Sequence, residues 1–66
     1  MIKKFKVNTI RPFKYLFEVY NTDTNKVKYI IATSDNIQVD FDLNPKSNNI
    51  VQVYDNLGEA LKTYDK

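Results

Sequence analysis

The sequence contains no cysteine and no histidine, and it has a single glycine and two prolines in 66 residues. Without cysteine there are no disulfides and no thiolate metal ligands, and without histidine there is no imidazole acid–base group. Neither a Ser-His nor a Cys-His nucleophile pair can form, and one glycine cannot make a glycine-rich phosphate-binding loop. We therefore expect a protein that is not an enzyme and that holds no metal or cofactor.

Long apolar runs are also missing from the sequence. No stretch approaches the roughly 20 apolar residues that cross a bilayer, and the start Met-Ile-Lys-Lys-Phe-Lys lacks the apolar segment of a signal peptide. We therefore expect a cytoplasmic protein without a membrane partner. The abundance of Asn, Lys, Ile and Tyr is typical of AT-rich bacterial genomes and their mobile elements, which suggests a phage or plasmid origin.

The chain is short but rich in rings, with five Tyr and four Phe. A domain of this length buries only roughly 60% of the surface that its unfolded chain exposes, so we expect one small domain spanning residues 1–66. Because neither disulfides nor metal can supplement its core, the aromatic rings must do so, or a partner chain must. A homodimer is one way to provide that partner.

The charges are unevenly distributed along the chain. Residues 1–33 carry seven Lys or Arg against two Asp or Glu, whereas residues 34–66 carry three against six, for a net charge of +2 overall. The total is too near neutral to require nucleic-acid binding. The two halves either form surfaces of opposite sign or carry charges placed for solubility.

Apolar and polar residues alternate over the first fifty residues, which is the period of β-strands. Arg11-Pro12 interrupts the alternation and predicts a bend, and turn-forming residues at 21–25 predict a hairpin. Further polar turns fall at 34–36 and 44–49. The sequence thus predicts five strands, over residues 2–9, 13–20, 26–33, 37–43 and 50–54.

The last twelve residues change to the period of a helix, with an apolar stripe at Leu57, Ala60, Leu61 and Tyr64. Asn56, with Glu59 three residues later, matches a capping box. The predicted fold is α+β: a small, mostly antiparallel five-stranded sheet, either a meander or a partly closed barrel, with one short C-terminal helix.

A single helix of this length covers only part of one sheet face. We expect two apolar faces, one with Leu16, Tyr20, Ile30 and Ala32, the other with Tyr15, Phe17, Val19, Val27, Tyr29 and Ile31. One face needs cover from curling into a barrel, a second copy or a different protein. We favour a small non-catalytic protein-binding module, such as a phage- or plasmid-encoded accessory protein or inhibitor, whose predicted protein-binding residues are Leu16, Tyr20, Ile30 and Lys28.

Nucleic-acid binding is the alternative. Rings among cations on an open sheet stack bases while the charges follow phosphates, and Tyr20 is predicted to share a face with some of the lysines. The lysines that carry this hypothesis are Lys4, Lys6, Lys14, Lys26 and Lys28. Asp40 and Asp42 would lie about 7 Å apart on one strand. This spacing loosely suits an acid and a base or a shared cation, although an ordinary solvated face explains them more simply.

Overall fold

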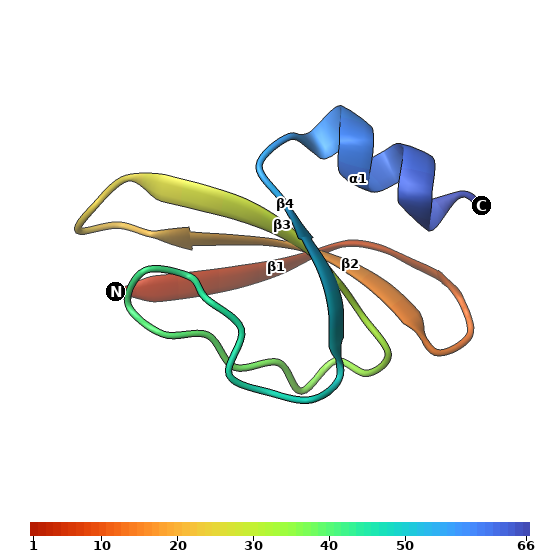
Figure 1. Ribbon diagram of the computed structural model, residues 1–66, viewed down its shortest axis with the longest axis horizontal. Coiled ribbons are helices and arrows are strands. Elements are labelled where there is room, and N and C mark those ends of the chain that lie inside the picture. Colours follow the sequence, from red (N-terminus) through yellow and green to blue (C-terminus); the bar gives the residue numbers. More distant parts are fainter.

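Four strands and one helix follow one another along the chain. The computed structural model describes the backbone of residues 1–66 and the side chains of residues 1–8 and 11–66. Its elements are β1 (Ile2–Arg11), β2 (Lys14–Asn21), β3 (Lys26–Ala32), β4 (Ile50–Tyr54) and α1 (Leu57–Tyr64). The strands pair antiparallel in the order β1-β2-β3-β4, so the sheet is an open meander with β1 and β4 at its edges (Figure 1). The predicted α+β class with an antiparallel sheet and a C-terminal helix is confirmed.

The prediction of a fifth strand over residues 37–43 is wrong. Only one isolated bridge, between Val39 and Pro45, forms there. The Asp40 carboxylate accepts hydrogen bonds from the backbone N–H groups of Asp42 and Asn44 at 2.9 and 2.8 Å, and the N–H of Leu43 donates to the Asp40 carbonyl at 3.0 Å. These local bonds replace a strand ladder with a turn, as Asp side chains often do.

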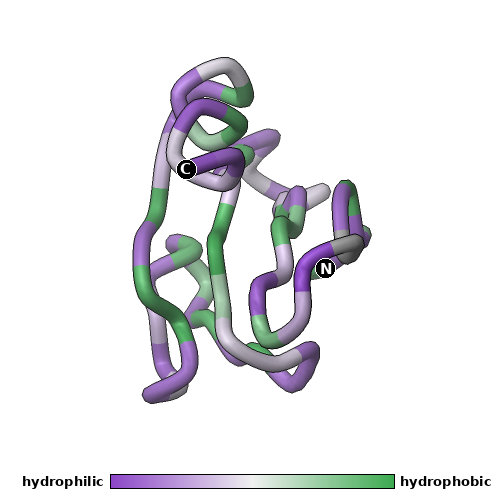
Figure 2. Tube along the Cα trace, turned by 90° about the vertical axis from the view of Figure 1, so that its right-hand side faces the viewer, coloured by the Kyte–Doolittle hydropathy of each residue, from purple (hydrophilic) through white to green (hydrophobic). Residues whose placement is uncertain are grey.

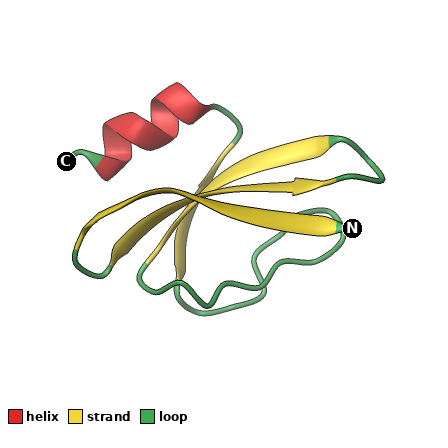
Figure 3. Cartoon of the chain, turned by 180° about the vertical axis from the view of Figure 1, so that it is seen from behind, coloured by secondary structure: helices red, strands yellow, loops and turns green.

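The molecule has three layers, which Figures 1 and 3 show from opposite sides. Helix α1 lies on one side of the sheet, and the long connection over residues 33–49 lies on the other. We call the sheet surface under α1 the helix face and the surface under residues 33–49 the loop face. A connection without regular structure therefore covers the apolar part of one sheet face.

The register of the β2–β3 hairpin decides which side chains share a face. Asn21 pairs with Lys26, so Leu16 lies opposite Ile31 and Phe17 opposite Ile30. The predicted sharing of one face by Leu16 and Ile30 is therefore wrong. Alternation fixes the faces within each strand, but the four-residue turn between them fixes how the two strands match.

The two faces bury separate apolar clusters. On the loop face, strand residues meet Ile37 and Leu43 from the connection, and the buried members of this cluster are Phe17, Val19, Ile30, Ala32, Ile37 and Leu43. On the helix face, the buried members are Leu16, Ile31, Ala60 and Tyr64. Figure 2 shows the corresponding alternation of hydrophobic and hydrophilic residues along the chain. Both faces thus contribute to the core, but the helix-face cluster is the smaller.

Helix α1 begins as its sequence predicts. The side chain of Asn56 accepts a hydrogen bond from the N–H of Glu59 at 3.2 Å, which confirms Asn56 as the N-cap. A Cβ at Gly58 would lie 3.0 Å from the capping oxygen of Asn56, so glycine leaves room for the cap. No helix within the described residues has the length and apolar character needed to cross a membrane.

The uneven charge distribution is partly resolved by pairing between the two halves of the chain. Three ion pairs join a lysine of a strand to an aspartate from residues 34–66, namely Lys6–Asp35, Lys26–Asp42 and Lys28–Asp55. Exposed pairs of this kind contribute at most about 1 kcal/mol each. They therefore orient the connection and the start of α1 against the sheet more than they stabilise the fold.

Candidate protein-binding face

Helix α1 covers only one end of the helix face. Its eight residues span about 12 Å, whereas the eight residues of β2 extend over about 26 Å. Tyr64 anchors it by donating a hydrogen bond to the Lys14 carbonyl at 3.0 Å, and Tyr54 donates to the hydroxyl of Thr63 at 2.9 Å. The covered end is therefore the one where β2 begins and β3 ends, above Leu16 and Ile31.

The other end of the helix face is open. The β3 residues that precede Tyr29 do not pair with β4. At this end of the sheet, the β2–β3 hairpin and the start of β1 project away from the helix (Figure 1). The apolar side chains at this end of the face are Phe5, Tyr20 and Val27, which we call the open patch. Phe5 is 50% exposed, Val27 is 39% exposed and Tyr20 is half-buried.

The open patch is an ordered surface spanning three strands. Tyr20 pairs across β2 and β3 with Val27, and Phe5 lies diagonally across on β1. The rings of Phe5 and Tyr20 stack with centroids 6.0 Å apart and planes 15° from parallel. Their geometry is that of a favourable aromatic pair, so each ring supports the orientation of the other.

Hydrogen bonds of Asn21, the last residue of β2, hold the hairpin that carries the open patch. Asn21 is fully buried, its amide nitrogen donates to the Phe41 carbonyl at 2.9 Å, and its amide oxygen accepts from the N–H of Asp23 at 2.8 Å. Asn25 adopts a φ of 60°, which asparagine tolerates. One buried side chain thus ties the hairpin to the connection on the loop face.

A charge of each sign borders the open patch. Glu18, half-buried between Phe5 and Tyr29 in the strand register, forms no ion pair with any described side chain. Lys3, opposite Tyr20, is exposed and likewise has no carboxylate partner among the described residues. A surface that matches this patch would place a cation against Glu18 and an anion against Lys3.

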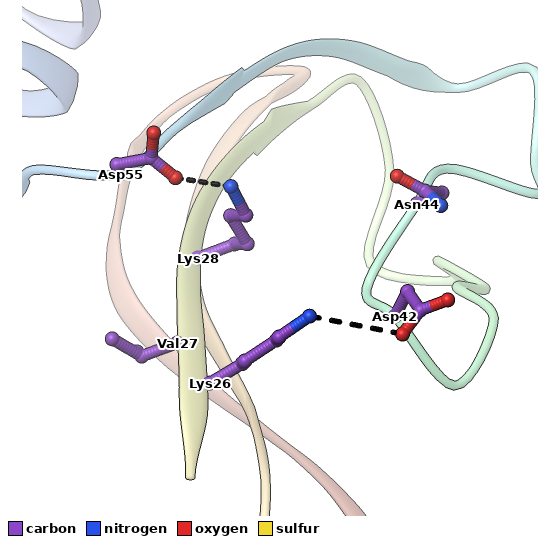
Figure 4. A pocket seen from close by; sticks show the side chains of 6 residues that line it. All are labelled: Lys26, Val27, Lys28, Asp42, Asn44 and Asp55. Atoms are coloured by element: carbon purple, nitrogen blue, oxygen red, sulfur yellow. Dashed lines mark hydrogen bonds and ion pairs between the residues drawn. The ribbon is translucent and has the colours of Figure 1, made fainter. Parts of the chain in front are cut away.

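The four residues predicted to bind protein are not brought together. Leu16 and Ile30 are fully buried, on the helix face and the loop face respectively, and neither offers surface to a partner. Tyr20 lies in the open patch. Lys28 lies on the loop face, where it pairs with Asp55 at the rim of an open cavity of about 540 Å³ (Figure 4).

Figure 4 also shows why Tyr20 does not share a face with Lys26 and Lys28. Val27 points to the opposite side of β3 from Lys26 and Lys28, and Tyr20 shares its face with Val27. Of the lysines in the nucleic-acid hypothesis, only Lys14 lies on the helix face, and its ammonium donates to the Thr63 and Lys66 carbonyls. The basic, aromatic platform that base stacking requires is therefore not assembled around Tyr20.

The remaining lysines of that hypothesis, Lys4 and Lys6, also bond within the chain. Lys4 donates to the Ile37 carbonyl at 2.9 Å and Lys6 pairs with Asp35 at 3.2 Å. Both lie on the loop face, opposite Val19 and Phe17. Their charges hold the connection against β1.

Asp40 and Asp42 do not form the pair that a strand would give. Hydrogen bonds from the Asn44 backbone, the Asn44 side chain and the Asp42 backbone lower the pKa of Asp40 below its ordinary value of 3.8. A carboxyl group held ionised in this way is a poor proton donor. No cluster of three or more metal-ligating side chains exists among the described residues.

Two patch residues, Phe5 and Val27, were not predicted. Each belongs to an alternating run whose other members suggested a buried face, so the sequence offered no local sign that the helix would stop short of them. Comparison of the chain with protein-family models, curated proteins and solved structures found no significant match. The candidate face therefore depends on the geometry alone.

Proposed function

We propose that this chain is a small non-catalytic protein-binding module that docks on another protein through the open patch. The observation that carries the proposal is the stacked pair of Phe5 and Tyr20, which lies beside Val27 on the part of the helix face that α1 leaves uncovered. Aromatic residues supply much of the binding energy in protein interfaces because they bury a large area with few rotatable bonds. The module would act by occupying a surface of its partner, as an accessory protein or inhibitor does.

Glu18 defines the chemistry of the partner. Burying an unpaired carboxylate is costly, so we expect a partner that covers the patch to supply a cation to Glu18. We infer a complementary surface of apolar side chains around a lysine or arginine, with a carboxylate beside Lys3. A wholly apolar surface would leave Glu18 buried and unpaired.

Quantitative capture from the cell that produces the chain tests the proposal. The double variant F5S/Y20S removes both rings of the patch, and F41S is its matched control, because Phe41 is 57% exposed on the connection beneath the loop face. We expect a protein retained by the wild type and by F41S to be lost with F5S/Y20S. Equal retention by all three would remove the patch from the proposal.

The charge reversal E18K provides a second, independent variant, and we expect it to weaken capture by at least ~10-fold, since like charges would then meet at the interface. Capture of nucleic acid instead, with an affinity that falls steeply with salt, would favour the alternative function.

A further inference from the structure

Another exposed aromatic residue, Phe13, lies at the opposite end of the sheet from the open patch. Phe13, in the turn between β1 and β2, is 81% exposed and has a φ of 57°. Bulky L-residues seldom adopt this left-handed backbone, and a glycine or asparagine would adopt it with less strain. The sequence nevertheless places an aromatic ring at the tip of the turn.

Two other residues share this backbone conformation, and each has an explanation within the chain. Asn25 is of a type that tolerates it. Leu43, at φ 66°, buries its side chain in the loop-face cluster, so packing offsets its strain. Phe13 gains no such burial. Strained, exposed residues of this kind occur preferentially at functional positions.

Phe13 also borders an open, largely apolar cavity beside edge strand β4. The cavity has a volume of about 440 Å³, and its apolar lining includes Pro12, Phe13, Ile31, Ala32 and Val51. Val51 is 60% exposed. A protruding ring and an apolar cavity thus lie side by side at the same end of the molecule.

The two edges of the sheet differ in charge. Edge strand β1 carries four cations and no anion, namely Lys3, Lys4, Lys6 and Arg11. Edge strand β4, Ile-Val-Gln-Val-Tyr, has no charge and no proline. Charged residues on an edge prevent strand pairing between copies. Two β1 strands would therefore repel each other, whereas two β4 strands would not.

We propose that two copies of this chain associate through β4, with the strands antiparallel about a two-fold axis near Gln52. Phe13 and Val51 of each copy become buried at the junction, next to the other copy's cavity. Because β4 is short and its ladder with β3 shifts between Ile31 and Ala32, backbone bonds alone would be few. The apolar groups then supply most of the affinity. This surface is separate from the open patch.

Sedimentation velocity from about 1 µM to about 1 mM tests this dimer. We expect the mass to rise with concentration from 7.8 kDa toward twice that value. V51K places a charge on the β4 edge, and V7K places the same charge on the β1 edge, where Val7 is 43% exposed. V51K should weaken association by at least ~10-fold, the loss expected for removing a buried interface anchor, and V7K should leave it unchanged.

The variant F13N removes the ring while keeping a residue suited to the backbone, and it should weaken association as much as V51K does. Hydrogen exchange of the wild type adds a measurement that needs no variant: β4 amides should become protected as concentration rises, and β1 amides should not. A monomer at every concentration, or equal weakening by V7K and V51K, would overturn the proposal. F5S/Y20S should leave the dimer intact, so this proposal and the binding function can fail separately.

Discussion

Replacing Phe13 with asparagine is expected to stabilise the isolated monomer, although it removes a large apolar side chain. A non-glycine residue in the left-handed region costs about 1–2 kcal/mol, and asparagine relieves part of this. Since 81% of Phe13 is exposed, about a fifth of its side chain is buried, which corresponds to about 0.3–0.6 kcal/mol. The net gain in unfolding free energy is therefore about 0.5–1 kcal/mol, or a rise in Tm of roughly 2–8 °C for a domain of this size.

The matched control is L43N, at a position with nearly the same backbone angle. Leu43 is only 1% exposed, so its replacement relieves the backbone but removes a core side chain, and it should destabilise the fold by about 2 kcal/mol or more. Thermal and urea unfolding measure both, at low micromolar concentration, where we expect the monomer to predominate. The reasoning would be refuted if F13N lowered the unfolding free energy by 1 kcal/mol, because Phe13 would then stabilise its own chain.

Three further predictions concern the loops and the helix. D40N keeps an acceptor for the Asn44 N–H, whereas D40A does not, so D40A should be the less stable at pH 7 in urea unfolding. Because the folded pKa of Asp40 lies below 3.8, its stabilising contribution is present above that pH and is lost as the pH falls through the folded value. The unfolding free energy of D40N should therefore change less between pH 5 and pH 2 than that of the wild type. A pH dependence identical to that of the wild type would contradict this. N21A should cost about 1–3 kcal/mol in unfolding free energy, since it removes the buried amide that bonds the Phe41 carbonyl and the Asp23 N–H; a cost near zero would show that water replaces the amide. G58A should gain less than about 0.5 kcal/mol instead of the full ~1 kcal/mol of helix propensity, because its Cβ would crowd the Asn56 cap; a full gain in Tm would show that the cap tolerates it.

Local signals in the sequence predicted most of the elements. The run from Ile50 to Tyr54 forms β4 with the predicted bounds, and the Asn56 cap starts α1 where the capping pattern indicates. Pro12 marks the turn between β1 and β2. Each of these features depends on neighbouring residues alone, which is why patterns in the sequence suffice.

The errors arose where competing side-chain bonds, turn length or packing between elements override the alternation of the sequence. Residues 37–43 alternate like a strand, but the side chain of Asp40 competes for the backbone and makes a turn. Leu16 and Ile30 occupy similar positions in their alternating runs, yet the length of the turn over residues 22–25 places them on opposite faces of the sheet. The open patch depends on how much of the sheet α1 covers, and this is a property of packing between elements. Tyr20 was predicted as a binding residue because the surplus of aromatic residues is visible in the sequence. Its neighbours Phe5 and Val27 could be recognised only from the strand register.

Photo-crosslinking from single positions tests the binding face most directly. A benzophenone-bearing phenylalanine analogue at position 5 lies in the open patch, and the same analogue at position 41 lies on the connection beneath the loop face, with both native rings about equally exposed at 50% and 57%. In the cell that produces the chain, we predict a discrete covalent adduct with another protein from position 5 and none from position 41. The same adducts from both positions, or an adduct from position 41 alone, would contradict the account.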